Sequence, residues 1–79
     1  MKQTQKSEWE IQYEIFRKIF ARSKKGNLWA KIDCYIVSVF ERNGDWVYCI
    51  SDDDEPLYES GFISEEDALQ SAFSELFYT

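Results

Sequence analysis

The chain has 79 residues, of which 44 % are hydrophobic and 18 % aromatic, and it carries a formal net charge of −6. A chain of this length is expected to form one domain, residues 1–79, and its apolar content excludes a disordered segment, which lacks the side chains to offset chain entropy. It contains no run of about 18 apolar residues, and its polar first residues show no secretion signal, so we expect a cytoplasmic protein.

The charges are divided unevenly along the chain. Residues 1–25 hold seven cations and three acids, whereas residues 26–79 hold two cations, Lys31 and Arg42, and twelve acids. Opposite charges within one small domain need no partner, so we interpret the asymmetry as a match between the first helix and the rest of the fold.

Residues 7–25 are predicted to form the first helix. Ser7 and Glu10 have the spacing of a capping box, in which each side chain accepts from the backbone of the other residue. Gly26 is expected to end the helix in the left-handed conformation. The predicted buried face follows the helical period and comprises Trp9, Tyr13, Phe16, Phe20, Ile15 and Ile19.

Three strands are predicted next. Residues 29–42 and 46–51 are rich in β-branched and aromatic side chains, and Asn43-Gly44 between them is a strong hairpin signal because both residues tolerate positive φ. Residues 57–62 can form a short third strand, with Pro56 just before it, where a missing N–H does least harm.

The last element is predicted to be an amphipathic helix that begins after Ser64. Ser64 is a suitable N-cap, and the three acids that follow suit the positive end of a helix. Its buried face is expected to comprise Ala68, Leu69, Ala72, Phe73, Leu76 and Phe77. The predicted fold is therefore α+β, in the order α-β-β-β-α, with a three-stranded antiparallel sheet packed with two helices.

This order of elements resembles that of double-stranded-RNA-binding domains. Ser64, Ala68 and Ala72 stand where that family has the cap and the packing alanines of its last helix. That family has lysines just after the cap to hold phosphates, but this chain has Glu65 and Glu66, whose carboxylates would repel a nucleic-acid backbone. We therefore expect no direct binding of nucleic acid.

The run of residues 51–56, S-D-D-D-E-P, holds four consecutive carboxylates. A helix–loop–helix calcium site needs ligands at loop positions 1, 3 and 5, Gly at position 6 and an acid at position 12. A loop that starts at Asp52 has Leu57 at position 6 and Ile63 at position 12, and a start at Asp53 fails as well. We interpret the run as a solvated turn whose Asp side chains bond their own backbone, and we expect no metal site.

Neither catalysis nor a disulfide is expected. The chain has no histidine and no glycine-rich phosphate loop, so we predict a protein that is not an enzyme and needs no cofactor. A two-residue Asn43-Gly44 turn places Cys49 opposite Ser38, so Cys34 is displaced from Cys49 by roughly 13 Å along the strands. A disulfide needs Cα atoms within about 7 Å, so both cysteines are predicted to be reduced thiols in the core.

Both faces of the predicted hairpin are apolar, although a half-buried strand should alternate apolar and polar residues. One face comprises Tyr35, Val37, Val39, Trp46, Tyr48 and Ile50, and the other comprises Ile32, Cys34, Ile36, Phe40, Val47 and Cys49. In folds of this class both helices usually cover one face, which would leave one of these two sets exposed. There are three alternatives. The protein itself covers both faces, with one helix on each face or with long aromatic side chains of the first helix wrapped over an edge; a homodimer packs sheet on sheet; or another protein docks on the exposed face.

We expect a small acidic regulatory or adaptor module that binds another protein, or itself as a homodimer, through an aromatic sheet face, with no membrane contact. Large aromatic side chains dominate interface energetics, so Trp46 and Tyr48 are the first candidates. The predicted partner-binding residues are Trp46, Tyr48, Tyr35, Val37 and Ile50.

The alternative hypothesis is an acidic mimic of nucleic acid, an inhibitor of the kind that a phage could encode, which occupies the basic groove of a nucleic-acid-binding protein. Its phosphate-like charges would come from Asp52, Asp53, Asp54, Glu55, Glu65 and Glu66, with Asp45, Glu59 and Asp67. Salt separates the two hypotheses, because mimic binding should weaken steeply with ionic strength and aromatic docking should hardly change.

Overall fold

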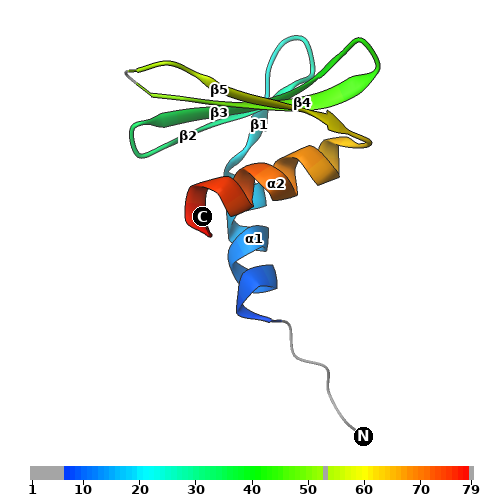
Figure 1. Ribbon diagram of the computed structural model, residues 1–79. Coiled ribbons are helices and arrows are strands. Elements are labelled where there is room, and N and C mark those ends of the chain that lie inside the picture. Colours follow the sequence, from blue (N-terminus) through cyan, green and yellow to red (C-terminus); the bar gives the residue numbers. More distant parts are fainter. Residues whose placement is uncertain (1–6, 53, 79) are drawn as a thin grey trace, which may run out of the picture.

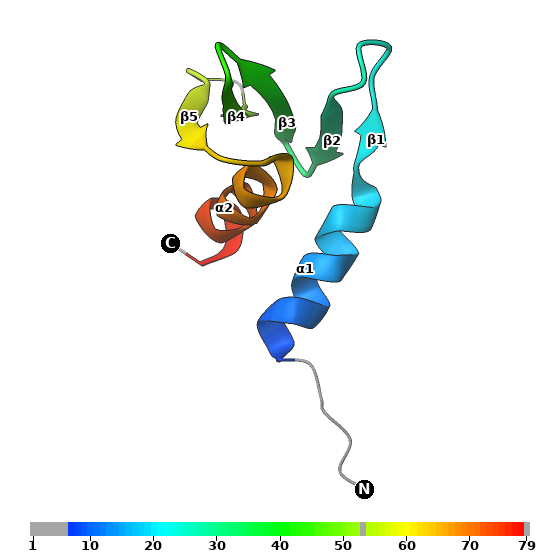
Figure 2. The ribbon, with the colours of Figure 1, turned by 90° about the vertical axis from the view of Figure 1, so that its right-hand side faces the viewer.

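The computed structural model describes residues 7–52 and 54–78. The elements are α1 (Glu8–Ile19), β1 (Ala21–Arg22), β2 (Leu28–Ile32), β3 (Tyr35–Arg42), β4 (Asp45–Ser51), β5 (Leu57–Phe62) and α2 (Glu65–Phe77). The strands form one antiparallel sheet in the order β1-β2-β3-β4-β5. Both helices lie on the same side of this sheet (Figures 1 and 2). The predicted α+β class is confirmed, but the sheet has five strands instead of three.

The extra strands arise because residues 29–42 do not form one continuous strand. Asp33 and Cys34 make a turn that divides this segment into β2 and β3, and Asp33 has a φ of 56°. Aspartate adopts this left-handed conformation more readily than most residues, because its short side chain can bond the local backbone. Cys34 is therefore an exposed turn residue, and its predicted place in the core is wrong.

Helix α1 is shorter than predicted, because the chain leaves it at Phe20 in an extended conformation. Residues 21–22 then pair with β2, and Gly26, with a φ of 86°, lies in the turn between these strands and does not cap the helix. The backbone N–H of Ser23 donates to the carbonyl of Asn27 (2.8 Å), which closes this turn. At the other end of α1, the predicted capping box of Ser7 and Glu10 is confirmed.

The predicted hairpin of β3 and β4 is confirmed, together with its register. Asn43 and Gly44 both have positive φ (53° and 86°), and the pairs run from Arg42–Asp45 to Ile36–Ser51. A two-residue turn thus determines which side chains of these two strands share a face.

Strand β5 follows the edge of β4 and contains one irregularity. Tyr48 pairs with Glu59 and Trp46 pairs with Phe62, so β5 has one more residue than β4 between these pairs. An extra residue of this kind is a β-bulge, and Gly61, with a φ of 92°, supplies the left-handed conformation. The bulge places Phe62 on the same side as Glu59, where its ring stacks on that of Tyr48 (5.7 Å between centroids).

The core lies between the sheet and α2, and α1 packs against it through aromatic rings. Phe73 is central to it: its ring lies 5.0–5.5 Å from those of five other residues, Trp9, Tyr13, Phe16, Phe77 and Tyr78. The buried cluster is completed by residues of β3, β4 and α2, namely Val37, Val39, Tyr48, Ile50, Ala68, Leu69 and Ala72.

Among the described residues, Arg17 of α1 and Arg22 of β1 form charged contacts with the start of α2. The Arg22 guanidinium donates to both carboxylate oxygens of Glu65 (2.7 and 2.9 Å), and Arg17 lies 3.4 Å from Glu66. The pair of Arg17 and Glu66 joins the first helix to the rest of the fold as predicted, whereas Arg22, which was predicted to be helical, binds Glu65 from β1.

Candidate functional site

The face predicted to bind a partner is the covered face of the sheet. Val37, Tyr48 and Ile50 are buried beneath the helices, and Tyr35 and Trp46 are partly buried against the same cluster. The exposure assumed for these residues is therefore wrong. The register correctly grouped them on one face, but only the position of the helices decides which of two apolar faces is covered.

The opposite face of the sheet, which we call the open face, is covered by no helix of the described residues (Figure 1). Strand register places Trp29, Ser38, Cys49 and Tyr58 in one row across β2 to β5. Neighbouring rows on this face contain Lys31, Ile36, Ser51, Phe40 and Val47. Trp29 and Tyr58 are 45 % and 50 % exposed, so large aromatic surface remains in contact with solvent.

Arg42 contacts two aromatic rings of the open face through its guanidinium. Its guanidinium carbon lies 5.3 Å from the ring centroid of Phe40 on β3 and 5.6 Å from that of Tyr58 on β5. Because β4 runs between those strands, the guanidinium and the two rings together span β4, where Val47 is 1 % exposed. These cation–π contacts hold the aromatic side chains in place without a covering helix.

The open face also differs in charge from the rest of residues 26–79. Lys31 and Arg42 are the only two cations of residues 26–79, and both lie on this face by register. Asp45 is paired with Arg42 at one end of the face. The aromatic surface is thus bordered by positive charge in a protein with a net charge of −6.

The residues of the acidic-mimic hypothesis do not form one patch. Asp52, Asp54 and Glu55 lie in the turn before β5, whereas Glu65 and Glu66 lie after it, at the start of α2. The six residues of β5 separate the two groups by about 20 Å. Asp53 lies outside the described residues.

The contacts of these acids also weigh against the mimic hypothesis. Glu65 and Glu66 are both engaged with arginines of the same chain, Arg22 and Arg17. The Asp52 carboxylate accepts from the backbone N–H of Asp54 (2.7 Å), which is the behaviour predicted for a turn.

The described residues contain no group of three or more His, Cys, Asp or Glu side chains that could hold a metal ion. Cys34 and Cys49 are both free thiols, and Cys49 is buried as predicted. In the same described part of the chain, no helix is long and apolar enough to span a bilayer.

Two tyrosines of the buried cluster, Tyr13 on α1 and Tyr48 on β4, have raised pKa values. Burial is the main cause for Tyr13, whose pKa rises further because its hydroxyl donates to the Glu66 carboxylate. Burial, followed by the nearby carboxylates of Glu75 and Glu59, raises the pKa of Tyr48 to about 12. Both side chains are neutral phenols in the folded protein at neutral pH.

The raised pKa of Tyr48 predicts alkaline unfolding. Its folded value of about 12 exceeds the value of about 10 for an exposed tyrosine, so its stabilising contribution is complete below about pH 10 and is lost as the pH approaches 12. We expect ionisation of Tyr48 to lower the free energy of unfolding by about 2 kcal/mol at about pH 12. Urea unfolding followed by tryptophan fluorescence measures this decrease in the free energy of unfolding. In Tyr48→Phe, which has no phenol at this position, the decrease should be smaller by about the same amount. An equal alkaline loss in both proteins would contradict the assignment.

Comparison of the chain with models of protein families, with curated proteins and with solved structures found no match. The candidate site therefore depends on the geometry and chemistry of the open face. Trp29, Tyr58 and Arg42 were not among the predicted site residues. Arg42 follows from the register of β3 and β4, but the pairings of β2 and β5 that add Trp29 and Tyr58 are set by tertiary structure.

Proposed function

We propose that this protein is a small interaction module that binds a partner protein on the open face of its sheet. The observation that supports it best is that half-exposed Trp29 and Tyr58 share this face with Lys31 and Arg42. The partner is proposed to present apolar groups bordered by carboxylates, which would complement the two cations.

The residue types of the open face are those that contribute most to protein interfaces. Trp, Tyr and Arg are enriched among side chains whose truncation costs the most binding energy. The cation–π contacts of Arg42 hold Phe40 and Tyr58 in place before binding, which lowers the entropic cost of ordering them in a complex.

A protein partner is favoured over a single-stranded nucleic acid for two reasons. Binding of single strands requires free aromatic faces for base stacking, and Arg42 already lies over the rings of Phe40 and Tyr58. It also requires many phosphate contacts, whereas this face has two cations and the chain has a net charge of −6.

Photo-crosslinking in cells is the direct test of the proposed face. A benzoylphenylalanine in place of Ile36, which is half exposed on the open face, should crosslink to a partner protein. The same probe in place of Ile63, which is 89 % exposed and lies between β5 and α2, is the matched control. Equal yields of crosslinked partner at the two positions, or crosslinking at position 63 alone, would mean that the partner does not bind the open face.

With the crosslinked partner purified, Trp29→Ala is expected to weaken binding by about 2 kcal/mol, roughly 30-fold in Kd, as for a central aromatic residue of an interface. Lys31→Glu should also weaken binding, because the partner is proposed to present carboxylates to this face. Ile63→Ala should leave the Kd unchanged. Isothermal titration calorimetry measures all three, and an unchanged Kd for Trp29→Ala would contradict the proposal.

Fluorescence anisotropy with labelled oligo-dT and oligo-U tests the competing class of ligand. We expect no binding at physiological salt. Binding that is lost in Trp29→Ala would assign the open face to single-stranded nucleic acid instead.

A further inference from the structure

Helix α1 has a second apolar face that the described residues leave half exposed. One face carries Tyr13 and Phe16 into the core. On another, Ile11, Ile15 and Ile19 recur every four residues and are 48–56 % exposed. Residues four apart lie above one another on a helix, so the three isoleucines form one continuous stripe. The prediction that Ile15 and Ile19 belong to the buried face is wrong for the single chain.

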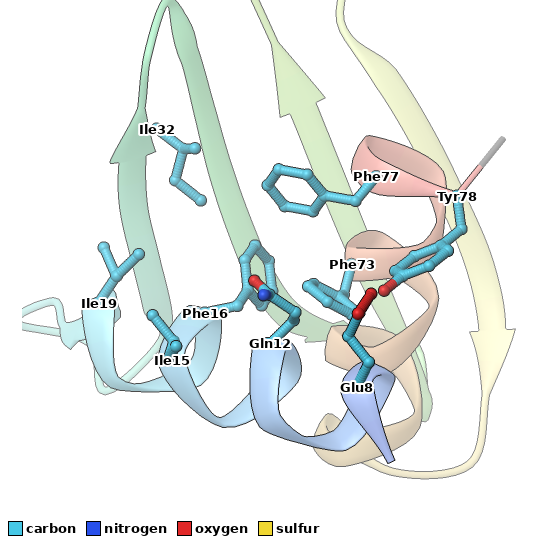
Figure 3. Close-up of a pocket in the computed structure, with 9 residues that line it drawn as sticks. All are labelled: Glu8, Gln12, Ile15, Phe16, Ile19, Ile32, Phe73, Phe77 and Tyr78. Carbon is cyan, nitrogen blue, oxygen red and sulfur yellow. The ribbon is translucent and has the colours of Figure 1, made fainter.

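The isoleucine stripe borders a hollow of about 270 Å³, which Glu8 and Gln12 line together with apolar side chains (Figure 3). Ile15 and Ile19 line it from α1, Ile32 from β2, and Phe77 with Tyr78 from the end of α2. Phe77 and Tyr78 are also half exposed. Helix α1 extends away from the sheet (Figure 2), and the side chains that line the hollow come from α1, β2 and the end of α2 (Figure 3).

We propose that a second copy of this chain covers the stripe, with its own α1 packed antiparallel to the first. The charges along α1 favour this occupant and this direction. Glu14 and Lys18 flank the stripe, next to Ile15 and Ile19, whereas Arg17 lies on the far side of α1 against Glu66. When Ile15 faces its own copy in an antiparallel pair, Lys18 of the second copy lies level with Gln12 and within one turn of Glu14, whereas a parallel pair would bring like charges together.

Two-fold symmetry specifies the contacts of this dimer. With the axis at Ile15, that residue faces its own copy, and Ile11 of each chain faces Ile19 of the other. The first turns of each α1 then lie against the hollow that Ile19 and Ile32 border in the other copy. The stripe and the hollow are thus parts of the same interface.

The open face of the sheet stays accessible in this arrangement. It lies on the side of the sheet away from both helices, so each dimer would present two copies of it (Figure 1). A partner with repeated binding sites would then be bound with higher avidity than a single domain allows. The dimer itself does not depend on the proposed function of that face.

Light scattering after size exclusion, at several protein concentrations, tests the dimer. The wild-type chain should have twice the monomer mass, and Ile15→Glu should raise the dimer Kd at least about 100-fold, because it places two like charges opposite each other. Ile63→Glu introduces the same charge at an exposed position between β5 and α2, outside the proposed interface, and should remain dimeric. Circular dichroism is expected to show that both variants are folded, since Ile15 is half exposed.

Two further variants identify the contact and its direction. Mixing Ile15→Glu with Ile15→Lys should restore a heterodimer, because opposite charges then meet at the axis. In a Cys34→Ser background, a mixture of Ile11→Cys and Ile19→Cys chains should form a mixed disulfide, whereas each variant alone should not. In the antiparallel dimer two Ile11 positions are displaced by about 12 Å along the helix, beyond disulfide reach.

A wild-type monomer at all concentrations would overturn the proposal, as would a dimer that Ile15→Glu leaves intact. Disulfides between two Ile11→Cys chains, with none in the mixture, would overturn the antiparallel direction.

Discussion

Phe73→Ala is expected to destabilise the domain more than any other single truncation of an aromatic side chain. Its ring contacts aromatic residues of both helices and is 2 % exposed. Replacing a buried Phe with Ala costs about 3–5 kcal/mol, because the lost burial is combined with the energy of the cavity that remains. A domain of 79 residues has a total stability of roughly 4–12 kcal/mol, so much of it would be lost.

Urea unfolding followed by tryptophan fluorescence measures this change. Ile63→Ala is the control, because it also truncates a large apolar side chain but at a position that is 89 % exposed. We expect the control to change the free energy of unfolding by less than about 0.5 kcal/mol. If Phe73→Ala costs no more than Ile63→Ala, the aromatic cluster does not hold α1 and α2 together.

Val37→Asp is expected to unfold the protein, and Ile36→Asp is expected to leave it folded. The two residues are neighbours on β3 but point to opposite faces, and they are 0 % and 48 % exposed. A carboxylate at position 37 would be buried under α2 without a partner, at a cost of several kcal/mol. At position 36 it stays in water next to Lys31, its partner across the strands.

Circular dichroism and thermal unfolding of the two variants test which face is covered. Ile36→Asp should lower the free energy of unfolding by no more than about 1 kcal/mol, mainly because aspartate has a poor strand propensity. The reverse result, with Ile36→Asp unfolded and Val37→Asp folded, would mean that the helices cover the face we describe as open. The same pair therefore tests the basis of the proposed binding surface.

Local chemistry was sufficient to predict several elements. The capping box of Ser7 and Glu10, the Asn43-Gly44 turn and the Ser64 cap each depend on residues within a few positions of one another. The register of β3 and β4 followed because a two-residue turn admits one alignment of its strands.

The number of strands could have been predicted better. A strand of 14 residues is longer than most, and Asp33 in its middle is a turn former, so the division into β2 and β3 had a signal in the sequence. Strand β1 had no such signal, because residues 21–22 belong to the segment whose sequence pattern predicts a helix. In the structure these residues are extended, and the Arg22 side chain donates to Glu65 and to the carbonyl of Gly26.

The amino-acid sequence by itself determined the class of the fold, the caps and the central hairpin, because these depend on local hydrogen bonds and on periodicity. Only the tertiary structure decided which apolar face of the sheet is covered. Alternation along a strand separates the residues into two faces, but it does not say on which side α1 and α2 pack. Trp46 and Tyr48 therefore belong to the helix-covered side, and Trp29 and Tyr58 remain in solvent, because both helices bury their apolar surface against one side of the sheet.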